Sequence, residues 1–119
     1  MEIRVIREQP IKREELAKIA NEMFGNLVKA VVDVNQGIMA IGGEFHSDAE
    51  GLLSEKERST REHTWGINLY PEKAYDSEEF IEFDSMVNLK PAFGNRSRGV
   101  DSEETRRKII EIVRKLVIE

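Results

Sequence analysis

The sequence predicts an α+β domain, a two-layer sandwich in which a mixed, mostly antiparallel sheet of about five strands carries helices on one face. Three observations support this class: short β-branched segments bounded by Gly, Pro and Asn, segments with apolar residues at helical spacing, and a hairpin signal between neighbouring strands. The expected order is strand, helix, strand, strand, short helix, strand, strand, helix. With 119 residues, the chain is expected to form one domain around one core.

The N-terminal segment predicts a strand followed by a helix. Residues 2–7 alternate enough for a short strand, which Pro10 ends. Residues 12–24 place apolar side chains at helical spacing, and Gly25-Asn26 supplies a helix end. The sequence therefore predicts an amphipathic helix directly after the first strand.

A hairpin is predicted next. Residues 27–34 and 38–41 are β-branched and apolar, and residues 35–37 between them have turn chemistry. The helix before the hairpin favours a right-handed crossover, which makes the first two strands parallel. The first six elements match a ferredoxin-like order.

The middle of the chain predicts a short helix and a polar loop. Ser47 followed by Glu50 forms a capping-box pattern, which predicts a helix that continues through Leu53. Residues 54–63 are polar and charged, and we expect them to form an exposed, mobile loop.

The last third predicts two strands and the C-terminal helix. Residues 65–70 alternate as a half-buried strand that ends at Pro71. Residues 80–89 are long for one strand, and Asp84-Ser85 suggests a bulge or bend. Residues 109–117 carry a broad apolar stripe, as expected of a helix.

Composition excludes several classes of function. The chain has no Cys and two His residues, which excludes a thiol nucleophile, a disulfide framework and a Cys-based zinc site. We therefore expect no metal and no cofactor. A net charge of −5 repels phosphate backbones, so nucleic-acid binding is not expected. The abundance of charged residues of both signs is typical of a thermophile's surface. We also expect a cytoplasmic protein, since neither a membrane-spanning run nor a signal peptide is evident.

A loop rich in Arg precedes the C-terminal helix and is the first candidate site. Asn95, Arg96, Ser97 and Arg98 lie between two Gly residues, and two guanidinium groups there suit a phosphate or carboxylate. The start of the following helix adds a positive dipole. The alternative is structural: acidic residues at that helix start satisfy the dipole, and the Arg residues pair with acidic strand residues such as Asp84.

Two His residues form the second candidate. His46 and His63 could meet in space and, with Asp48, give a minimal metal centre or an acid–base pair. Spacing of two residues on a helix points side chains apart, so His46 and Asp48 need not share a face. A solvated loop or capping role is the simpler interpretation of both.

Polar residues inside predicted strands form the third candidate. Asn68, Asp84 and Asn88 interrupt apolar strands, where Asn and Asp are depleted. Alternation places Asn68 and Asp84 on the open face of the sheet, together with Tyr70 and Glu82. There Asp84 could act as a general base, with Asn68 and Asn88 as orienting donors. The simpler interpretation is an ordinary hydrated sheet face.

The same open face predicts a partner. If the register holds, apolar side chains lie in the same phase there: Leu27, Val31, Tyr70, Phe80 and Met86. Monomers usually avoid an apolar patch of this kind. We therefore expect either another element of the chain or a second copy to cover it, and we favour a homodimer.

Four sequence blocks resemble those of a small prokaryotic domain family of unknown function. The blocks are residues 42–50 (GGEFHSDAE), 65–71 (WGINLYP), 80–88 (FIEFDSMVN) and 94–98 (GNRSR). They follow in this order from the hairpin to the last helix. The resemblance implies one complete domain, and it implies no activity, substrate or cofactor.

The sequence thus favours a binding module for a phosphate- or carboxylate-bearing small molecule held by Arg96 and Arg98. One alternative is a small hydrolase or proton-transfer enzyme that uses Asp84 with His46 or His63. Another is a structural, dimeric interaction protein in which the polar residues are caps and tethers.

Overall fold

The computed structural model describes residues 2–119 and confirms an α+β fold built on a five-stranded sheet. In this sheet the strand order is β1-β4-β3-β5-β6, and every neighbouring pair is antiparallel. Its strands are β1 (Arg4–Ile6), β3 (Val28–Asp33), β4 (Ile38–Ile41), β5 (Thr64–Leu69) and β6 (Ile81–Glu82). The first and second predicted strands, β1 and β3, run in the same direction because each is antiparallel to β4, which lies between them.

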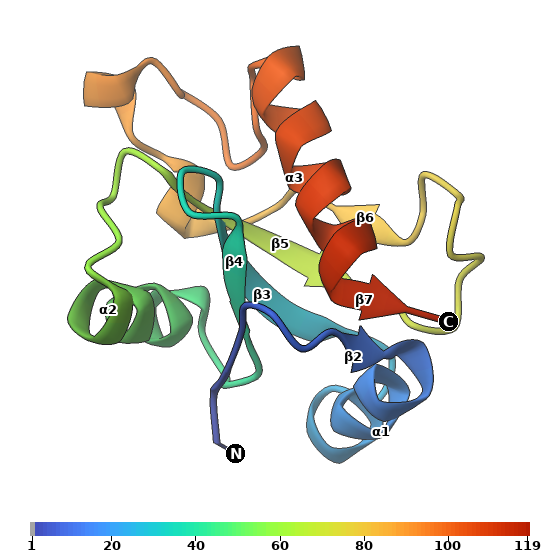
Figure 1. Ribbon diagram of the computed structural model, residues 1–119. Coiled ribbons are helices and arrows are strands. Elements are labelled where there is room, and N and C mark those ends of the chain that lie inside the picture. The colour runs from blue at the N-terminus through green and yellow to red at the C-terminus, as the bar shows by residue number, and fades with distance from the viewer. Residues whose placement is uncertain (1) are drawn as a thin grey trace.

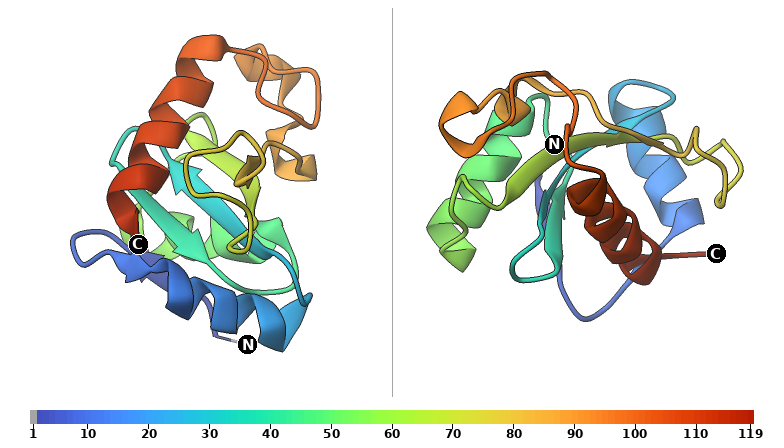
Figure 2. Two further views of the ribbon diagram at one scale, coloured as in Figure 1. Left: turned by 90° about the vertical axis from the view of Figure 1, so that its right-hand side faces the viewer. Right: turned by 90° about the horizontal axis from the view of Figure 1, so that it is seen from above.

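Three α-helices pack against this sheet, and they occupy both of its faces. They are α1 (Arg13–Met23), α2 (His46–Glu57) and α3 (Glu103–Leu116). Figure 1 and the right-hand view of Figure 2 show α1 and α3 on one side of the sheet and α2 on the other. The predicted placement of all helices on one face therefore needs correction for α2. A ferredoxin-like arrangement, which keeps its helices on one face, is excluded for the same reason.

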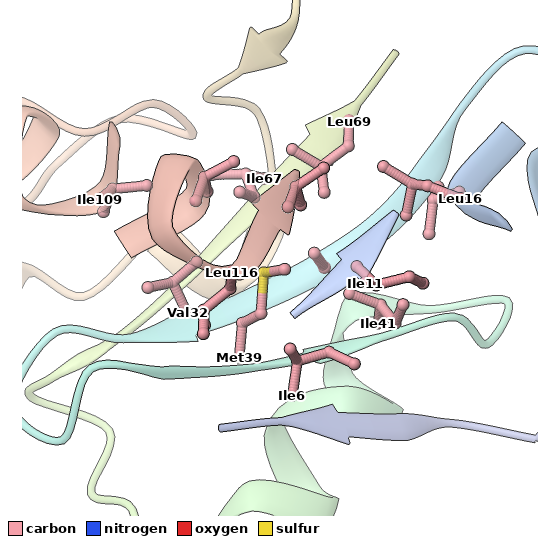
Figure 3. Close-up of a cluster of buried hydrophobic side chains, with 14 of the residues drawn as sticks. Ile6, Ile11, Leu16, Val32, Met39, Ile41, Ile67, Leu69, Ile109 and Leu116 are labelled. Atoms are coloured by element: carbon pink, nitrogen blue, oxygen red, sulfur yellow. The ribbon is translucent and has the colours of Figure 1, made fainter. Parts of the chain in front are cut away.

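The main core lies between the sheet and the pair α1 and α3. Alternate residues of each strand enter it, among them Val32, Met39 and Ile67, all of which are fully buried (Figure 3). Leu16 of α1 and Leu116 of α3 pack onto the same face of the sheet. This alternation is the period of two that the sequence shows.

A smaller core lies between the opposite sheet face and α2. It contains Val31, Ala40, Ala49 and Leu53, with Val5 at its edge. Three buried residues of α2 at spacings of three and four, His46, Ala49 and Leu53, form only a narrow stripe. Because most of the rest of α2 is polar, its extension to Glu57 left little trace in the sequence, and the first four residues of the predicted mobile loop, 54–57, are helical.

Coverage by α2 also changes the argument for a dimer. Val31 is fully buried beneath α2, and Phe80 is buried in the main core on the opposite face. Two of the five residues of the apolar patch that motivated the homodimer are therefore covered by the chain itself, whereas Met86 is 62% exposed. The homodimer stays a prediction.

After β6 the chain leaves the sheet and becomes irregular. The predicted strand over residues 80–89 is reduced to β6, and two short 3₁₀ helices follow, η1 (Met86–Asn88) and η2 (Pro91–Phe93). A separate parallel pair, β2 (Ile11–Lys12) and β7 (Val117–Ile118), joins the two ends of the chain. Within residues 2–119, no helix combines the length and apolar character that crossing a membrane requires.

Candidate functional site

A pocket of about 270 Å³ lies on the sheet face that carries α2, between the start of this helix and the segment after β6. We call it the His46 pocket. Residues from β3, α2, β5 and the two segments before α3 line it: Lys29, Phe45, His46, Ser47, Asn68, Asp84, Ser85, Met86, Val87 and Arg98. The pocket therefore joins segments far apart in sequence. Four of the candidate residues singled out above line it: His46, Asn68, Asp84 and Arg98.

The strand polar residues form a hydrogen-bonded network at one side of this pocket. Asn68 Nδ2 donates to Glu82 Oε1 at 2.9 Å, and the Tyr70 hydroxyl donates to the same oxygen at 2.7 Å. The expectation that these three residues share one face of the sheet is thus met. Burial, followed by the hydrogen bond to Glu82, raises the pKa of Tyr70 to about 12.

Asn68 also presents an unsatisfied acceptor. Asn68 is only 8% exposed, and its Oδ1 forms no hydrogen bond of ordinary geometry among residues 2–119, although the His46 ring lies close enough to interact with the Asn68 side chain. The amide orientation is fixed, because the Glu82 carboxylate can only accept and must face Nδ2. A buried acceptor without a donor costs free energy, so this oxygen is suited to a donor group supplied by a bound molecule.

His46 is the first residue of α2 and has one ring nitrogen anchored. Its Nε2 lies 2.8 Å from the carbonyl oxygen of Ile67, which requires Nε2 to carry the proton. Burial lowers the pKa of His46, and the hydrogen bond to Ile67, a side-chain interaction with Asn68 and the charge of Asp84 oppose this shift. The neutral ring therefore carries its lone pair on Nδ1.

Arg98 reaches the pocket from the loop before α3 and pairs with Asp84. Its Nε lies 2.7 Å from Asp84 Oδ1, and both side chains are about half exposed. The two terminal nitrogens of this guanidinium have no protein partner within residues 2–119. Asp84 thus fixes the orientation of Arg98 without occupying the fork that binds oxyanions bidentately.

Two further sources of positive potential face the pocket. Lys29 of β3 has no carboxylate partner in the described residues, and its charge contributes to the lowered pKa of His46. The N-cap residue of α2 is Phe45, whose side chain cannot cap the helix. The start of α2 therefore adds a partial positive charge beside Arg98 and Lys29, which the Asp48 carboxylate in the same turn partly offsets.

The predicted Arg loop is held by an internal anion. The Asp101 carboxylate accepts hydrogen bonds from the Arg96 backbone N–H at 3.0 Å and from the Ser97 hydroxyl at 2.6 Å. These bonds lower the pKa of Asp101. The backbone groups expected to receive an outside anion are therefore already bound, and Arg98 is the member of the loop that lines the His46 pocket.

Asn95 is the residue that closes this loop. It is 3% exposed, and its Nδ2 donates to the carbonyl oxygens of Asn88 and Gly99, each at 2.8 Å. Its Oδ1 accepts from the Asp101 backbone N–H at 2.8 Å. Asn95 positions Arg98 through the loop backbone, and Arg96 is exposed with no ion pair among the described residues.

Asn88 likewise serves the backbone. It is fully buried, and its side-chain amide binds the N–H and the C=O of Gly66 at 2.8 and 3.0 Å. Its Nδ2 also donates to the Arg98 carbonyl oxygen at 2.8 Å. Asn88 does not line the pocket, and its contribution is to fix the strand and the loop that do.

His63 lies away from this pocket. It precedes β5, at the opposite end of the strand from Asn68, and its nearest acidic neighbour is Glu62 at 3.8 Å. Across residues 2–119, no cluster of three or more His, Cys, Asp or Glu side chains is arranged to hold a metal ion. The two imidazoles are therefore not brought together, and His46 is the one that shares a pocket with Asp84.

Comparison with known families agrees with the resemblance to a domain family of unknown function. The profile of a family described as "Protein of unknown function (DUF5674)" matches residues 4–116. The chain belongs to this family. No curated protein and no solved structure matches it. In this DUF5674 protein the four blocks meet at one place, since they contribute His46, Asn68, Asp84 and Arg98 to the same pocket.

A second, larger hollow of the DUF5674 protein carries less specific chemistry. It measures about 430 Å³ and lies between α3 and the segment around Tyr75 and Phe80. Its charged residues are three Arg of α3 and three carboxylates, so its net charge is balanced. No buried polar atom without a partner lines it, as far as residues 2–119 are concerned. The His46 pocket is therefore the better candidate.

Several lining residues were not predicted. Lys29 interrupts the apolar run of β3, and this charged residue inside a strand was a usable signal. Phe45 gave none, because an isolated apolar residue beside a turn has many explanations, whereas Met86 was expected on the open face as part of an apolar patch. Ser85 was expected only as part of a bulge, yet it is buried and its Oγ accepts from the Val87 backbone N–H.

Proposed function

We propose that this protein binds a small molecule carrying a phosphate or carboxylate group in the His46 pocket, with Arg98 as the main anion ligand. The observation that carries the proposal is the geometry of Arg98. Its Nε pairs with Asp84, which holds the side chain in place, while both terminal nitrogens lack a protein partner in the described chain. A guanidinium so oriented is prepared to bind an oxyanion bidentately.

The charges around the pocket support the same proposal. The protein has a net charge of −5, yet the pocket lining includes Lys29 and Arg98 against the single carboxylate of Asp84. The uncapped start of α2 adds its partial positive charge. A local excess of positive charge in an acidic protein favours a small anion over a large polyanion, which the rest of the surface repels.

The test compares two Arg residues of one loop. Arg98→Gln removes the proposed anion ligand, whereas Arg96→Gln removes an equally exposed charge that does not line the pocket. We expect inorganic phosphate, at constant ionic strength, to raise the melting temperature of the parent protein and of Arg96→Gln. The stabilisation should reach about 2.7 kcal/mol when phosphate exceeds its Kd about 100-fold. Arg98→Gln should fold normally and lose this response.

Two results would count against the proposal. One is the absence of any phosphate- or carboxylate-dependent stabilisation of the parent protein. The other is an equal response in both Arg variants, since general screening by the anion acts on exposed charges alike.

A second candidate function is proton transfer or hydrolysis at the same pocket. His46 favours it, because a neutral imidazole with Nε2 held by Ile67 presents Nδ1 as a base. Asp84 lies in the same pocket and Arg98 could stabilise developing negative charge. Because Asp84 is paired with Arg98, His46 rather than Asp84 is the better base for this second candidate function.

His46→Gln separates the two functions. Gln can still donate to the Ile67 carbonyl oxygen, so the fold and phosphate binding should persist. If the protein is an enzyme, turnover of activated phosphate or carboxylate esters should fall by about 100-fold or more. If the parent protein shows no turnover that exceeds a mock purification, the binding function alone remains.

A further inference from the structure

We infer that the ligand of the His46 pocket is a small aromatic anion, whose ring lies between Phe45 and Met86 while its anionic group binds Arg98. This inference rests on the proposed function and adds the chemical class of the ligand. It starts from two exposed side chains at the mouth of the pocket.

Phe45 and Met86 are unusually exposed for large apolar residues. Their exposed fractions are 60% and 62%, the highest of the exposed large hydrophobic side chains in residues 2–119. Both line the His46 pocket, and they come from different segments, the N-cap of α2 and the start of η1. Exposed apolar surface that gathers at a hollow is typical of a binding site.

The backbone beneath each of these side chains is fixed. Phe45 precedes the buried His46, whose ring is anchored on β5. Met86 follows the buried Ser85, whose backbone N–H donates to the Arg98 carbonyl oxygen at 2.9 Å. The two side chains are therefore presented by rigid segments, so their exposure is a property of the fold.

The chemistry of Phe45 and Met86 favours an aromatic ring in the ligand. Phe stacks on another aromatic group with a preferred offset or edge-on geometry. The thioether of Met makes favourable contacts with aromatic rings and adapts to their shape. An aromatic group at the mouth would cover both side chains, and a pocket of about 270 Å³ limits the ligand to a small molecule.

The pocket behind the two side chains supplies the polar half of the ligand's environment. Arg98 and Lys29 attract the anionic group, and the start of α2 contributes to the same potential. Asn68, a residue 8% exposed, lies beside the His46 ring, and its Oδ1 forms no hydrogen bond of ordinary geometry among residues 2–119. These charges favour a small anion as the occupant over a second copy of the chain, which is itself acidic.

The test uses two phosphates that differ only in their apolar part. Phenyl phosphate and methyl phosphate carry the same charge, and binding of each to the full chain is measured by calorimetry. The parent protein should bind phenyl phosphate about tenfold more tightly. Phe45→Ala and Met86→Ala should each reduce this ratio toward one while leaving the affinity for methyl phosphate unchanged. Phe93→Ala, which changes an exposed Phe outside the pocket, should keep the tenfold ratio.

Each of the other outcomes overturns a specific part of this inference or of the proposed function. Equal affinities of the parent protein for both phosphates would overturn the aromatic ligand and leave the proposed anion site intact. Binding of neither phosphate would overturn the proposed function and this inference together. A tenfold ratio that survives in Phe45→Ala and Met86→Ala would place the ring elsewhere. A dimer in light scattering that Phe45→Ala dissolves would assign the two side chains to a second copy and overturn the inference.

Discussion

The side-chain amide of Asn88 forms both hydrogen bonds with the Gly66 backbone that a neighbouring strand would otherwise form. Its Oδ1 accepts from the Gly66 N–H at 2.8 Å, and its Nδ2 donates to the Gly66 carbonyl oxygen at 3.0 Å. The last strand of the sheet, β6, pairs only with Asn68 and Leu69, so the outer edge of β5 is otherwise unpaired at Gly66. One amide side chain therefore continues the sheet where the main chain has turned away.

Asn88→Ala should be strongly destabilising. It would leave a buried N–H and a buried C=O of Gly66 without partners, each at a cost of about 1–3 kcal/mol. We expect the free energy of unfolding, measured in urea, to fall by about 3 kcal/mol or more. Asn26→Ala changes an exposed Asn that makes no side-chain hydrogen bond in the described structure. It should stay within about 0.5 kcal/mol of the parent protein. A small loss in Asn88→Ala would contradict its structural role.

Gly66→Ala tests the close approach between β5 and the segment that follows β6. A Cβ atom at Gly66 would lie 2.5 Å from Ser85 Oγ and 2.9 Å from Val87 Cγ2. Because Ser85 is buried and its backbone is hydrogen-bonded, we expect a loss of about 1–3 kcal/mol from overpacking. Gly51→Ala is the matched control, since nothing lies within 4 Å of its added methyl group inside α2. It should increase stability by about 0.5–1 kcal/mol. Equal effects of the two substitutions would contradict the close packing at Gly66.

Lys90 predicts a rise in stability above neutral pH. Its side chain is 3% exposed, donates to the Thr64 and Arg61 carbonyl oxygens, and lies over the Trp65 ring. Burial lowers its pKa from 10.5 to about 8. Between these values the unfolded chain holds the proton that the folded chain has released, so stability rises with pH, by an amount on the order of 3 kcal/mol. Urea unfolding from pH 7 to 10 should show this rise, and Lys90→Met should remove it.

The raised pKa of Tyr70 predicts that stability falls as pH rises further. Its pKa is raised from 10.0 to about 12, so the unfolded chain releases this proton first. Stability then falls between pH 10 and 12, and the parent protein should be most stable near pH 10. Tyr70→Phe should weaken the fall without abolishing it, because burial also raises the pKa of Tyr75. An unchanged fall in Tyr70→Phe would assign it to other groups.

The sequence predicted elements whose signal is local. Alternation in β5 and the helical spacing of α1 and α3 lie within single segments, and those elements are present. The roles of Asn88 and Lys90 were out of reach, because their partners Gly66 and Thr64 lie 22 and 26 residues away. Nothing in the local pattern distinguishes an amide that completes a sheet from one that faces a ligand.

The candidate site was partly predictable for the same reason. Asn68 and Asp84 attract notice because polar residues of these types are rare in strands, and both line the His46 pocket. Asn95 attracts notice as a member of the Arg-rich loop, yet it closes that loop with hydrogen bonds to backbone carbonyls. Phe45 is ordinary by sequence and becomes informative only through its exposure at a pocket.

Asp84→Asn tests whether the Asp84 carboxylate helps anion binding by orienting Arg98 or weakens it by repelling the anion. Asn can still accept from the Arg98 Nε, so the guanidinium should keep its place, while the negative charge of Asp84 is removed. Loss of about 1 kcal/mol of electrostatic repulsion should strengthen phosphate binding about fivefold, as measured by calorimetry at fixed ionic strength. Glu79→Gln makes the same change in net charge at an exposed position beside Lys73, and it should leave phosphate affinity unchanged. Weaker phosphate binding in Asp84→Asn would mean that the Asp84 carboxylate helps phosphate binding by orienting Arg98 more than its negative charge weakens that binding.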